Sequence, residues 1–387
     1  MKKRIAIVGS GPIGLEAGLA AKTRGYPVTI YESGEVADSV KRWGHVRMFS
    51  PFSMNASAEG RALLREKGIT LPAEDAYLTG AAYSREYLEP LARELGVLTH
   101  TTVKAMAREG LGKRDCIGEP GRADESFRLL VEHDGIDRHE TAEIVFDCSG
   151  TFQNPNPLGD AGVPALGETA AREFIRYGLG EASDLEPWAG LRIMVVGGGH
   201  SAANVIVALA ALKRRHPSTK IHWLIKGPGP QALPRLPDDP LAERDRICAL
   251  ANEVVASGTA LLHPESTVLA LTRSGTGLEV TLQTSGVRRV FEVDRAIAAT
   301  GFRPDWSPAR ELHIQTCWAT EGTYPLAASL LGEAGGDCLA VPAFGAETLR
   351  HPEPNFFALG AKSYGRTPSF LITTGLQQIN FVLNSLT

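Results

Sequence analysis

Two short apolar runs, each followed by glycines and then by a helical pattern, organise the hydrophobic positions of this chain. The first run is RIAIV at residues 4–8, and the helical pattern after it covers residues 14–23. The second run is RIMVV at residues 192–196, after which small residues again open a helix. Continuous apolar runs of this length between turn residues are typical of strands buried on both faces of a parallel sheet.

The elements after each run follow the same order. Residues 28–32 (VTIYE) and 221–226 (IHWLIK) predict a second strand in each half. Residues 127–150 and 278–301 then predict antiparallel strands, the first pair joined by an Asp-Gly turn, before a buried strand that ends in glycine. Because a whole order of elements is not matched by chance, we interpret the chain as an internal duplication.

The remaining pattern predicts the domain organisation. Residues 151–168 are rich in proline, glycine and asparagine and predict a connection between domains. Helices are predicted near residues 58–67, 84–95 and 373–386. The predicted fold is α/β, with two Rossmann-like, three-layer dinucleotide-binding domains that carry β-meander insertions. The first domain is predicted at residues 1–155 and 306–387, and the second is inserted at residues 156–305.

Composition argues against several classes of protein. A net charge of −4 and an isoelectric point near 6.2 offer no basic field for nucleic acid or for an anionic membrane. The five cysteines form no C-x-x-C pair, which argues for a reducing compartment and against a disulfide framework or a dithiol centre. The apolar runs are too short for a signal peptide or a membrane span, so we expect a cytoplasmic protein. A homodimer is the expected assembly.

The first glycine turn, Gly9-Ser-Gly11-Pro-Ile-Gly14, has the dinucleotide-binding fingerprint. Gly9 permits the tight turn, Gly11 lets the backbone approach a pyrophosphate, and Gly14 allows the helix to pack closely on the strand. The helix N-terminus presents free N–H groups to the phosphates. Glu32 ends the second strand at the distance where an acid binds a ribose hydroxyl. A structural turn in an unrelated α/β fold is the alternative interpretation.

The second glycine turn, Gly197-Gly-Gly199-His-Ser-Ala202, repeats this pattern with alanine in the third position. Lys226 is predicted to stand where the first half has Glu32. An ammonium attracts a 2′-phosphate that a carboxylate would repel, so we predict that the second site prefers NADPH to NADH. The alternative is that Lys226 is a solvated residue at the end of its strand.

Two dinucleotide sites in one chain suit a flavoenzyme that a nicotinamide cofactor reduces. The first site ends in an acid and therefore suits the unphosphorylated adenosine ribose of FAD. NADPH would bind the second site and deliver hydride to the flavin. The predicted cofactors are therefore FAD and NADPH.

The chain also resembles the flavoproteins with two dinucleotide-binding domains over essentially its whole length. The likeness includes both glycine turns, the strand ends FDCSG and AIAATGF, and the C-terminal segment NFFALGAKSYGRTPSFLITTGLQQI. The resemblance implies that the C-terminal segment returns to the FAD domain, with Gly360, Thr373 and Thr374 beside the flavin ring. Many relatives have Gly-Asp where this chain has Gly360-Ala361, so the usual carboxylate contact to the ribityl chain of the flavin is not expected here.

Residues 42–57, RWGHVRMFSPFSMNAS, resemble the flavin-covering region of flavin-containing monooxygenases. Trp43 and the triplet that begins at Asn55 match that region, and the resemblance implies that Asn55 contacts the flavin or nicotinamide and supports a C4a-hydroperoxide. His45 and Arg47 are predicted to line the substrate side of the flavin, unless they only pack the loop. The monooxygenase fingerprint F-x-G-x-x-x-H-x-x-x-(Y/F) is absent near the end of the first domain.

The predicted catalytic residues are Asn55, Arg47 and His45. The predicted cofactor-binding residues are Gly9, Gly11, Pro12, Gly14, Glu32, Ser33, Trp43, Val103, Ser149, Gly150, Gly197, Gly199, His200, Ser201, Ala202, Lys226, Gly301, Gly360, Thr373 and Thr374. His351 and Tyr364 flank the C-terminal segment and are further candidates to face a substrate. No metal is expected, because the ten histidines show no metal-ligand spacing.

Reductases of the same group are the rival interpretation. Thioredoxin-reductase-like flavoproteins need a C-x-x-C pair, and bacillithiol disulfide reductase-like members use a cysteine inside the first glycine turn, where this chain has Ile13. Cys148 is interpreted as a small buried residue.

We therefore predict an enzyme, an FAD-dependent oxidoreductase reduced by NADPH. The leading prediction is a monooxygenase that uses O2 and a C4a-hydroperoxyflavin to oxygenate a small N-, S- or carbonyl-containing substrate. The alternatives are an NADPH-dependent reductase of a disulfide or quinone, and a flavin-binding sensor without turnover.

Overall fold

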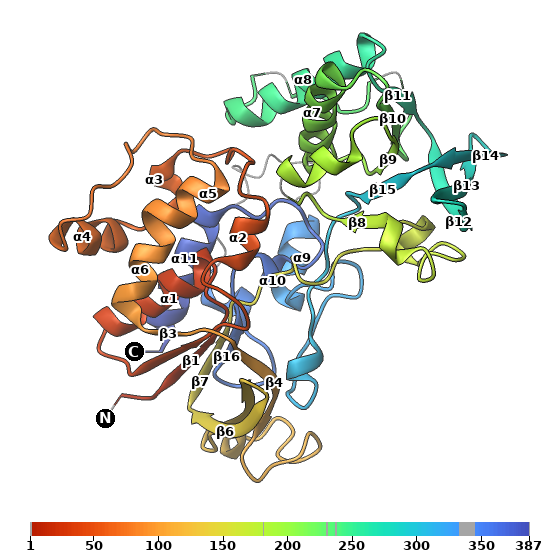
Figure 1. Cartoon of the computed structure of the whole chain (residues 1–387). Helices are drawn as coiled ribbons and strands as arrows, with labels where there is room; N and C mark the ends of the chain where they lie inside the picture. Colours follow the sequence, from red (N-terminus) through yellow and green to blue (C-terminus); the bar gives the residue numbers. More distant parts are fainter. Residues whose placement is uncertain (1, 181, 230, 237, 333–344, 387) are drawn as a thin grey trace. The chain divides into compact units, whose positions relative to one another are not determined.

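Two compact units make up the chain in this computed structural model (Figure 1). Unit 1 comprises Met1–Lys41, Pro51–Asn154 and Arg303–Thr387, and unit 2 comprises Arg42–Ser50 and Pro155–Phe302. The structure describes residues 2–180, 182–229, 231–236, 238–332 and 345–386. Cys338 lies outside the described residues.

The units divide close to the predicted domain ends, with one addition. Unit 2 takes in Arg42–Ser50, a segment that the sequence analysis assigned to the first domain. The division into independently folding domains stays a prediction.

Unit 1 contains a parallel sheet in the order β16-β7-β1-β2-β3 and an antiparallel sheet in the order β4-β5-β6. Its strands are β1 (Ile5–Val8), β2 (Val28–Tyr31), β3 (Val97–Leu98), β4 (Thr101–Arg108), β5 (Phe127–His133), β6 (Ile136–Ala142), β7 (Ile144–Asp147) and β16 (Phe356–Ala358). Its helices are α1 (Pro12–Thr23), α2 (Asp38–Arg42, which runs into the segment grouped with unit 2), α3 (Phe52–Asn55), α4 (Ala58–Glu66), α5 (Gly80–Tyr83), α6 (Glu89–Leu95), α9 (Tyr324–Gly332), α10 (Ala361–Tyr364) and α11 (Ile372–Ser385).

Alternate residues of the strands in unit 1 face two different layers. Ala6 of β1 packs against the antiparallel sheet, in a core that includes Met106 and Phe127. Helix α1 packs on the other face, since a Cβ on Gly18 would lie 2.6 Å from Cδ1 of Ile30. Helix α11 lies beside α1 (Figure 1), so the C-terminal segment completes this helical layer.

Unit 2 repeats the arrangement, with a parallel sheet in the order β11-β10-β9-β15-β8 and an antiparallel sheet in the order β12-β13-β14. Its strands are β8 (Ile175–Tyr177), β9 (Arg192–Val196), β10 (Lys220–Leu224), β11 (Leu261–His263), β12 (Ser266–Ser274), β13 (Gly277–Thr284), β14 (Val287–Val293) and β15 (Arg295–Ala298). Its main helices are α7 (His200–Arg215) and α8 (Ala242–Ala256).

The apolar run of β9 serves both faces of its sheet. Ile193 and Val195 pack among side chains of α7 and α8. Met194 and Val196 pack against the antiparallel sheet β12-β13-β14. A strand covered on both faces has no polar side to alternate with, which explains its uninterrupted hydrophobic run. The predicted α/β class, its three layers and its two β-meander insertions are confirmed.

None of the helices among the described residues has the length and apolar character to cross a lipid bilayer.

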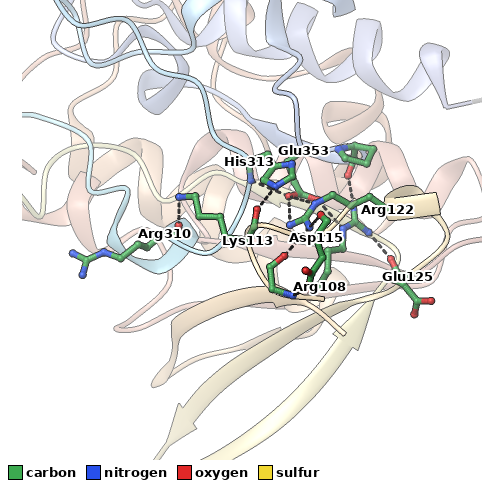
Figure 2. Close-up of polar contacts among 10 residues, drawn as sticks. Arg108, Lys113, Asp115, Arg122, Glu125, Arg310, His313 and Glu353 are labelled. Atoms are coloured by element: carbon green, nitrogen blue, oxygen red, sulfur yellow. Dashed lines mark hydrogen bonds and ion pairs between the residues drawn. The ribbon is translucent and has the colours of Figure 1, made fainter. Parts of the chain in front are cut away.

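A buried cluster of charges fastens the C-terminal part of the chain to the antiparallel sheet of unit 1 (Figure 2). Arg108 of β4 donates from Nε to Oε1 of Glu353 at 2.7 Å, and Arg122 donates from Nε to Oε2 at 3.0 Å. The backbone N–H of His313 donates to the same carboxylate at 2.9 Å. The side chains of Arg108 and Glu353 are completely buried. The carboxylate of Glu353 therefore joins its own segment to residues 108–122 and to residue 313, which are distant in the sequence.

The carboxylate of Glu353 should contribute strongly to the free energy of unfolding of unit 1. We expect Glu353→Gln to lower the free energy of unfolding by about 3–5 kcal/mol, because it leaves two buried guanidiniums without their counter-charge. Urea denaturation measures the change. The matched control is Glu109→Gln, which removes an exposed partner of Arg128 and should cost at most about 1 kcal/mol.

The loss of stability in Glu353→Gln, relative to the natural chain, should depend on pH. Burial raises the pKa of Glu353, but hydrogen bonds from Arg122, His313 and Arg108 outweigh it and hold the pKa below its ordinary value. The stabilisation is therefore complete above the pKa of the unfolded chain and is lost as the pH falls through the folded value. The loss of unfolding free energy in Glu353→Gln should therefore be smaller in acid than at neutral pH, and an equal loss at both would contradict a lowered pKa of Glu353.

Candidate nucleotide-binding sites

The first glycine turn joins β1 to α1 and can be built only with glycine at two positions. Gly9 has φ +100°, and a Cβ there would lie 2.8 Å from the carbonyl oxygen of Cys148. A Cβ on Gly14 would lie 1.9 Å from the carbonyl oxygen of Gly9. Gly11 differs, because a Cβ there would meet no atom within 4 Å. Protein atoms thus leave no room for a side chain at Gly9 and Gly14, whereas the space beside Gly11 is open.

The open position is also the start of the helix. Gly11 is the N-cap of α1 and has no side-chain capping bond, and Pro12 follows it. The N–H groups of the first helical turn therefore face the open side of the turn, as in anion-binding helix N-termini.

Glu32 lies across this turn, directly after β2. Its Oε2 accepts hydrogen bonds from the backbone N–H of Ser10 at 2.8 Å and from the hydroxyl of Ser10 at 2.9 Å. Its Oε1 accepts from the N–H of Gly34 at 3.0 Å, and the hydroxyl of Ser33 lies 3.4 Å away. The predicted ribose-binding acid is therefore fixed beside the predicted pyrophosphate-binding turn.

The C-terminal segment meets the same turn. Cβ atoms added to Gly360 and Gly375 would lie 3.0 Å and 2.4 Å from atoms of Ile13, which stands inside the turn. Gln378 of α11 accepts a hydrogen bond from the N–H of Gly360 at 2.8 Å. The predicted contact residues Thr373 and Thr374 lie in the first turn of α11. The structure thus brings the N-terminal and C-terminal parts of the predicted flavin site together.

A buried ion pair underlies this region, and the sequence analysis missed it. Asp147, the last residue of β7, and Lys362 of α10 are each about 1% exposed, with 2.6 Å between Oδ2 and Nζ. The hydroxyl of Ser149, a predicted contact residue, lies 2.6 Å from Asp147 and 3.0 Å from Lys362. Gly150 then turns away with φ +69°. In the sequence, the one sign of this ion pair was Asp147, a charged residue at the end of the apolar strand IVFD.

Other predicted residues of unit 1 lie in its interior. Val103 of β4 belongs to the core between the two sheets. His351 is buried, which lowers its pKa to about 4, and its Nδ1 accepts from the N–H of Gln315 at 3.2 Å. Burial raises the pKa of Tyr364 to about 12. His351 and Tyr364 are thus buried in unit 1, and that they face a substrate stays a prediction.

Asn55, a predicted catalytic residue, is held in a buried polar network. Its Nδ2 donates to the backbone carbonyl oxygen of Pro51 at 2.9 Å, and its backbone carbonyl oxygen accepts from the hydroxyl of Tyr83 at 2.5 Å. Tyr83 stacks on Tyr87 with ring centroids 5.8 Å apart. A π-helical turn, Ser84–Leu88, contains Tyr87 and links α5 to α6, and such turns recur at functional sites.

The network ends at Glu16 on α1, close after the first glycine turn. The carboxylate oxygen Oε1 of Glu16 accepts from the hydroxyl of Tyr87 at 2.5 Å and from the backbone N–H of Ser57 at 2.9 Å. Glu16 is 2% exposed. The segment from Asn55 to Ser57 is therefore anchored to the helix that carries the turn, and no local sequence motif identified Glu16 as the anchor.

The second glycine turn joins β9 to α7 with the same construction. Gly197 has φ +136°, and a Cβ there would lie 2.2 Å from the carbonyl oxygen of Ala299. Gly199 is the N-cap of α7 without a side-chain capping bond, and a Cβ there would meet nothing within 4 Å. Ala202 is fully buried at the third position. This turn is also open where a phosphate would approach.

The residues that start α7 are partly covered. His200 is the first residue of α7, and its ring lies edge-on to Phe49 with centroids 5.2 Å apart. Burial and the nearby charge of Arg244 lower the pKa of His200. Ser201 follows it in the first turn, and Gly301, with φ +86°, follows β15.

The strand register corrects the predicted equivalence of Lys226 and Glu32. The N–H of Gly9 donates to the carbonyl of Tyr31, and the N–H of Gly197 donates to the carbonyl of Leu224. Leu224 therefore matches Tyr31, the next residue Ile225 matches Glu32, and Lys226 matches Ser33. The predicted match of Lys226 to Glu32 was wrong by one residue. The apolar sequence did not show that the buried Ile225 already lies beyond the end of the strand.

Lys226 nevertheless lies beyond the carboxyl end of β10, near the open turn. Its Nζ lies 2.9 Å from Oδ1 of Asp160, and the two side chains are 63% and 51% exposed. This neighbour was not foreseen from the sequence.

Trp43, His45 and Arg47 lie in the segment that groups with unit 2. Arg47 has its Nη1 3.8 Å from Oε1 of Glu243, near the start of α8. Asn55 belongs to unit 1. Within neither unit does the structure unite the three predicted catalytic residues, Asn55, Arg47 and His45.

Comparisons with known proteins match this architecture. A family model described as pyridine nucleotide-disulphide oxidoreductase matches residues 6–114. Among curated proteins, none matches the chain.

Solved structures with the same fold cover the whole chain. A bacillithiol disulfide reductase from Bacillus cereus is 17% identical with a TM-score of 0.72, and covers 100% of this chain and 99% of its own. An ornithine N-hydroxylase from Kutzneria sp. 744, solved with reduced FAD, NADP+ and L-ornithine, is 16% identical with a TM-score of 0.68 and the same coverage. A thioredoxin reductase from T. acidophilum is 14% identical with a TM-score of 0.64, again over 100% and 99%. The predicted resemblance to flavoproteins with two dinucleotide-binding domains is confirmed at the level of the fold.

The buried carboxyl of Glu16 should oppose folding as the pH rises. Burial raises its pKa above the ordinary value of 4.5. The folded chain then holds this proton more tightly than the unfolded chain, so stability falls as the pH rises from about 4.5 to the folded value. Glu16→Gln keeps an acceptor for Tyr87 and Ser57 but cannot ionise.

We therefore expect the free energy of unfolding of Glu16→Gln, relative to that of the natural chain, to increase as the pH rises. Each pH unit by which the folded pKa of Glu16 exceeds the unfolded pKa should add about 1.4 kcal/mol to this difference. Urea denaturation between pH 4 and 8 measures this difference. Glu66→Gln, at the exposed last residue of α4, is the control and should show no such trend. Parallel curves for Glu16→Gln and the natural chain would rule out a raised pKa.

Proposed function

We propose that this protein is an FAD-dependent oxidoreductase that NADPH reduces, with FAD held by unit 1 and NADPH by unit 2. The observation that carries the proposal is the pair of glycine turns, each open at the glycine where a pyrophosphate approaches. The ornithine N-hydroxylase of the same fold was solved with both kinds of cofactor.

The residues of unit 1 suit FAD. The open turn at Gly11 and the N–H groups of α1 would bind the pyrophosphate, and Glu32 would accept hydrogen bonds from the adenosine ribose. Gly360 and the first turn of α11 would meet the flavin end, because both contact Ile13 in the turn. Bound FAD supplies two-electron chemistry, accepting hydride from a nicotinamide and passing electrons onward.

The residues of unit 2 suit a nicotinamide dinucleotide. Gly199 and the N-terminus of α7 would bind its pyrophosphate. The strand position that holds an acid in unit 1 holds the buried Ile225 here, so no carboxylate of β10 repels a 2′-phosphate. Lys226 supplies an ammonium one residue further on, which favours NADPH over NADH.

We propose oxygen transfer to a small N-, S- or carbonyl-containing substrate as the reaction. Two buried cysteines, Cys148 and Cys248, support this choice over disulfide reduction. Burial raises the pKa of Cys148 well above its ordinary value and also raises that of Cys248, so neither thiol ionises readily. The first glycine turn carries Ile13 instead of a cysteine. Asn55, whose side chain is bonded to Pro51 and whose backbone is bonded to Tyr83, would then meet the reacting end of the flavin.

A reductase is the second candidate, because the bacillithiol disulfide reductase matches the whole fold with a TM-score of 0.72. Its acceptor would be a quinone or a disulfide, and no oxygen would be inserted. A homodimer and a cytoplasmic location stay predictions.

Absorbance spectroscopy separates these candidates. We expect the purified protein to be yellow and to bleach on anaerobic addition of NADPH. On mixing with air, a transient near-UV band before the yellow colour returns supports oxygen transfer. Immediate return of the colour with stoichiometric peroxide, together with NADPH consumption that depends on a quinone or disulfide, supports the reductase. A flavin that NADPH fails to bleach at a useful rate contradicts both and leaves a sensor.

Two matched alanine substitutions test the assignment of the cofactors to the units. Neither Gly11 nor Gly199 has positive φ, and a Cβ at either would touch no protein atom, so both variants should fold normally. Gly11→Ala should weaken FAD binding by about tenfold or more, because the Cβ occupies the pyrophosphate position. Gly199→Ala should keep the FAD and weaken NADPH binding by a similar factor. Equal loss of both cofactors in either variant would contradict the assignment.

A further inference from the structure

The ion pair between Lys226 and Asp160 sits where unit 2 would meet the adenosine ribose of its nucleotide. Lys226 follows β10, whose carboxyl end adjoins the end of β9 and the glycine turn. In folds of this kind, the side chain beyond the second strand contacts the ribose or its 2′-phosphate. Ile225 is only 3% exposed and offers no polar group there. The first charged side chain beyond β10 is therefore Lys226, which pairs with Asp160.

Asp160 does not owe its position to Lys226. It belongs to a short loop whose backbone is fastened by the buried carboxylate of Glu168. That carboxylate accepts hydrogen bonds from the N–H groups of Leu158 at 2.8 Å, Gly159 at 3.2 Å and Ala165 at 2.8 Å. The hydroxyl of Tyr177 donates to it at 2.6 Å. The loop would therefore present a carboxylate near the end of β10 whether or not the lysine were there.

The pair is exposed and can open to a ligand. Both side chains are more than half exposed, and a single exposed ion pair contributes little to stability. A nucleotide with a 2′-phosphate would bind Lys226 only by displacing Asp160, and it would meet the repulsion of that carboxylate. A nucleotide with a free 2′-hydroxyl could donate a hydrogen bond to Asp160 and leave the pair intact.

We propose that Asp160 determines the choice of nicotinamide cofactor in unit 2, weakening the preference for NADPH that Lys226 alone would create and allowing NADH to bind. This rests on the proposed function, in which unit 2 binds a nicotinamide dinucleotide. The carboxylate that partly offsets the attraction of Lys226 for a 2′-phosphate thus comes from the loop before β8, and not from the strand end that supplies Glu32 in unit 1.

The test compares binding of NADP+ and NAD+ by isothermal titration calorimetry, at low ionic strength, with the full-length protein. Removing the negative charge in Asp160→Asn should raise the affinity for NADP+ relative to NAD+ by about tenfold, as expected for one charge close to the 2′-phosphate. Asp160→Ala should act in the same direction. Lys226→Met should shift the ratio the opposite way. Added salt should reduce each change.

A charge-matched control is available elsewhere in unit 2. Glu173 forms an ion pair with Arg273, and both side chains are more than half exposed. Glu173→Gln changes the net charge by the same amount and should leave the ratio of the two affinities unchanged.

The outcomes separate the inference from the function on which it rests. A ratio that Asp160→Asn and Asp160→Ala leave within twofold of the natural value overturns the role of Asp160, while the assignment of the nucleotide to unit 2 stands. If the natural protein binds neither NADP+ nor NAD+, the proposed function fails and the inference fails with it. A shift produced equally by Glu173→Gln would show a general charge effect and would also overturn the role of Asp160.

Discussion

The close approach of a helix start to a strand end is the constraint on which this structure depends. In unit 1, Gly14 leaves α1 so near to the turn that any side chain would overlap the carbonyl of Gly9. In unit 2, Gly197 turns the chain so tightly that a Cβ would overlap Ala299. This geometry starts α1 and α7 at N-cap glycines that have no side-chain capping bond and have open space around them. The fold therefore provides an anion-binding position twice, before any specific side chain is considered.

The two units differ in the side chains that surround this common feature. Unit 1 fixes Glu32 against Ser10, and it brings in the C-terminal segment through Ile13, Gly360 and Gly375. Unit 2 has no such acid on β10 and places Lys226 beside Asp160. This difference fits the proposal of FAD in unit 1 and a nicotinamide dinucleotide in unit 2. It also explains why the glycines alone do not distinguish the cofactors.

The sequence predicted those parts of the fold that depend on local pattern. The runs of β1 and β9, the helices after them and the Asp134-Gly135 turn were found because burial on two faces and positive φ leave a clear mark in sequence. The edge strands β8 and β16 were missed, since their strand partners β15 and β7 are distant in the chain. The helix α8 was also missed. The pairs Asp147–Lys362 and Arg108–Glu353 join residues more than 200 positions apart, which no local pattern reveals.

The site shows the same division. Gly9, Gly11, Gly197 and Gly199 stand where the fingerprint placed them, whereas Lys226 was misaligned by one residue. The error arose because the apolar run continues through Ile225, one residue past the end of β10, so that the charged Lys226 seemed to end the strand. The hydrogen bond from Gly197 to Leu224 fixes the register. The anchoring role of Glu16 depends on Tyr87, which a π-helical turn carries to it.

The central claim is that one chain binds two different dinucleotides, one in each unit. Its most direct test is a count of bound cofactors on the same sample. FAD released by denaturation would be measured by absorbance, and NADP+ binding to the undenatured protein would be measured by equilibrium dialysis. The account predicts one FAD and one NADP+ per chain, with excess free FAD unable to displace the NADP+. A single nucleotide per chain, for which FAD and NADP+ compete, would contradict it.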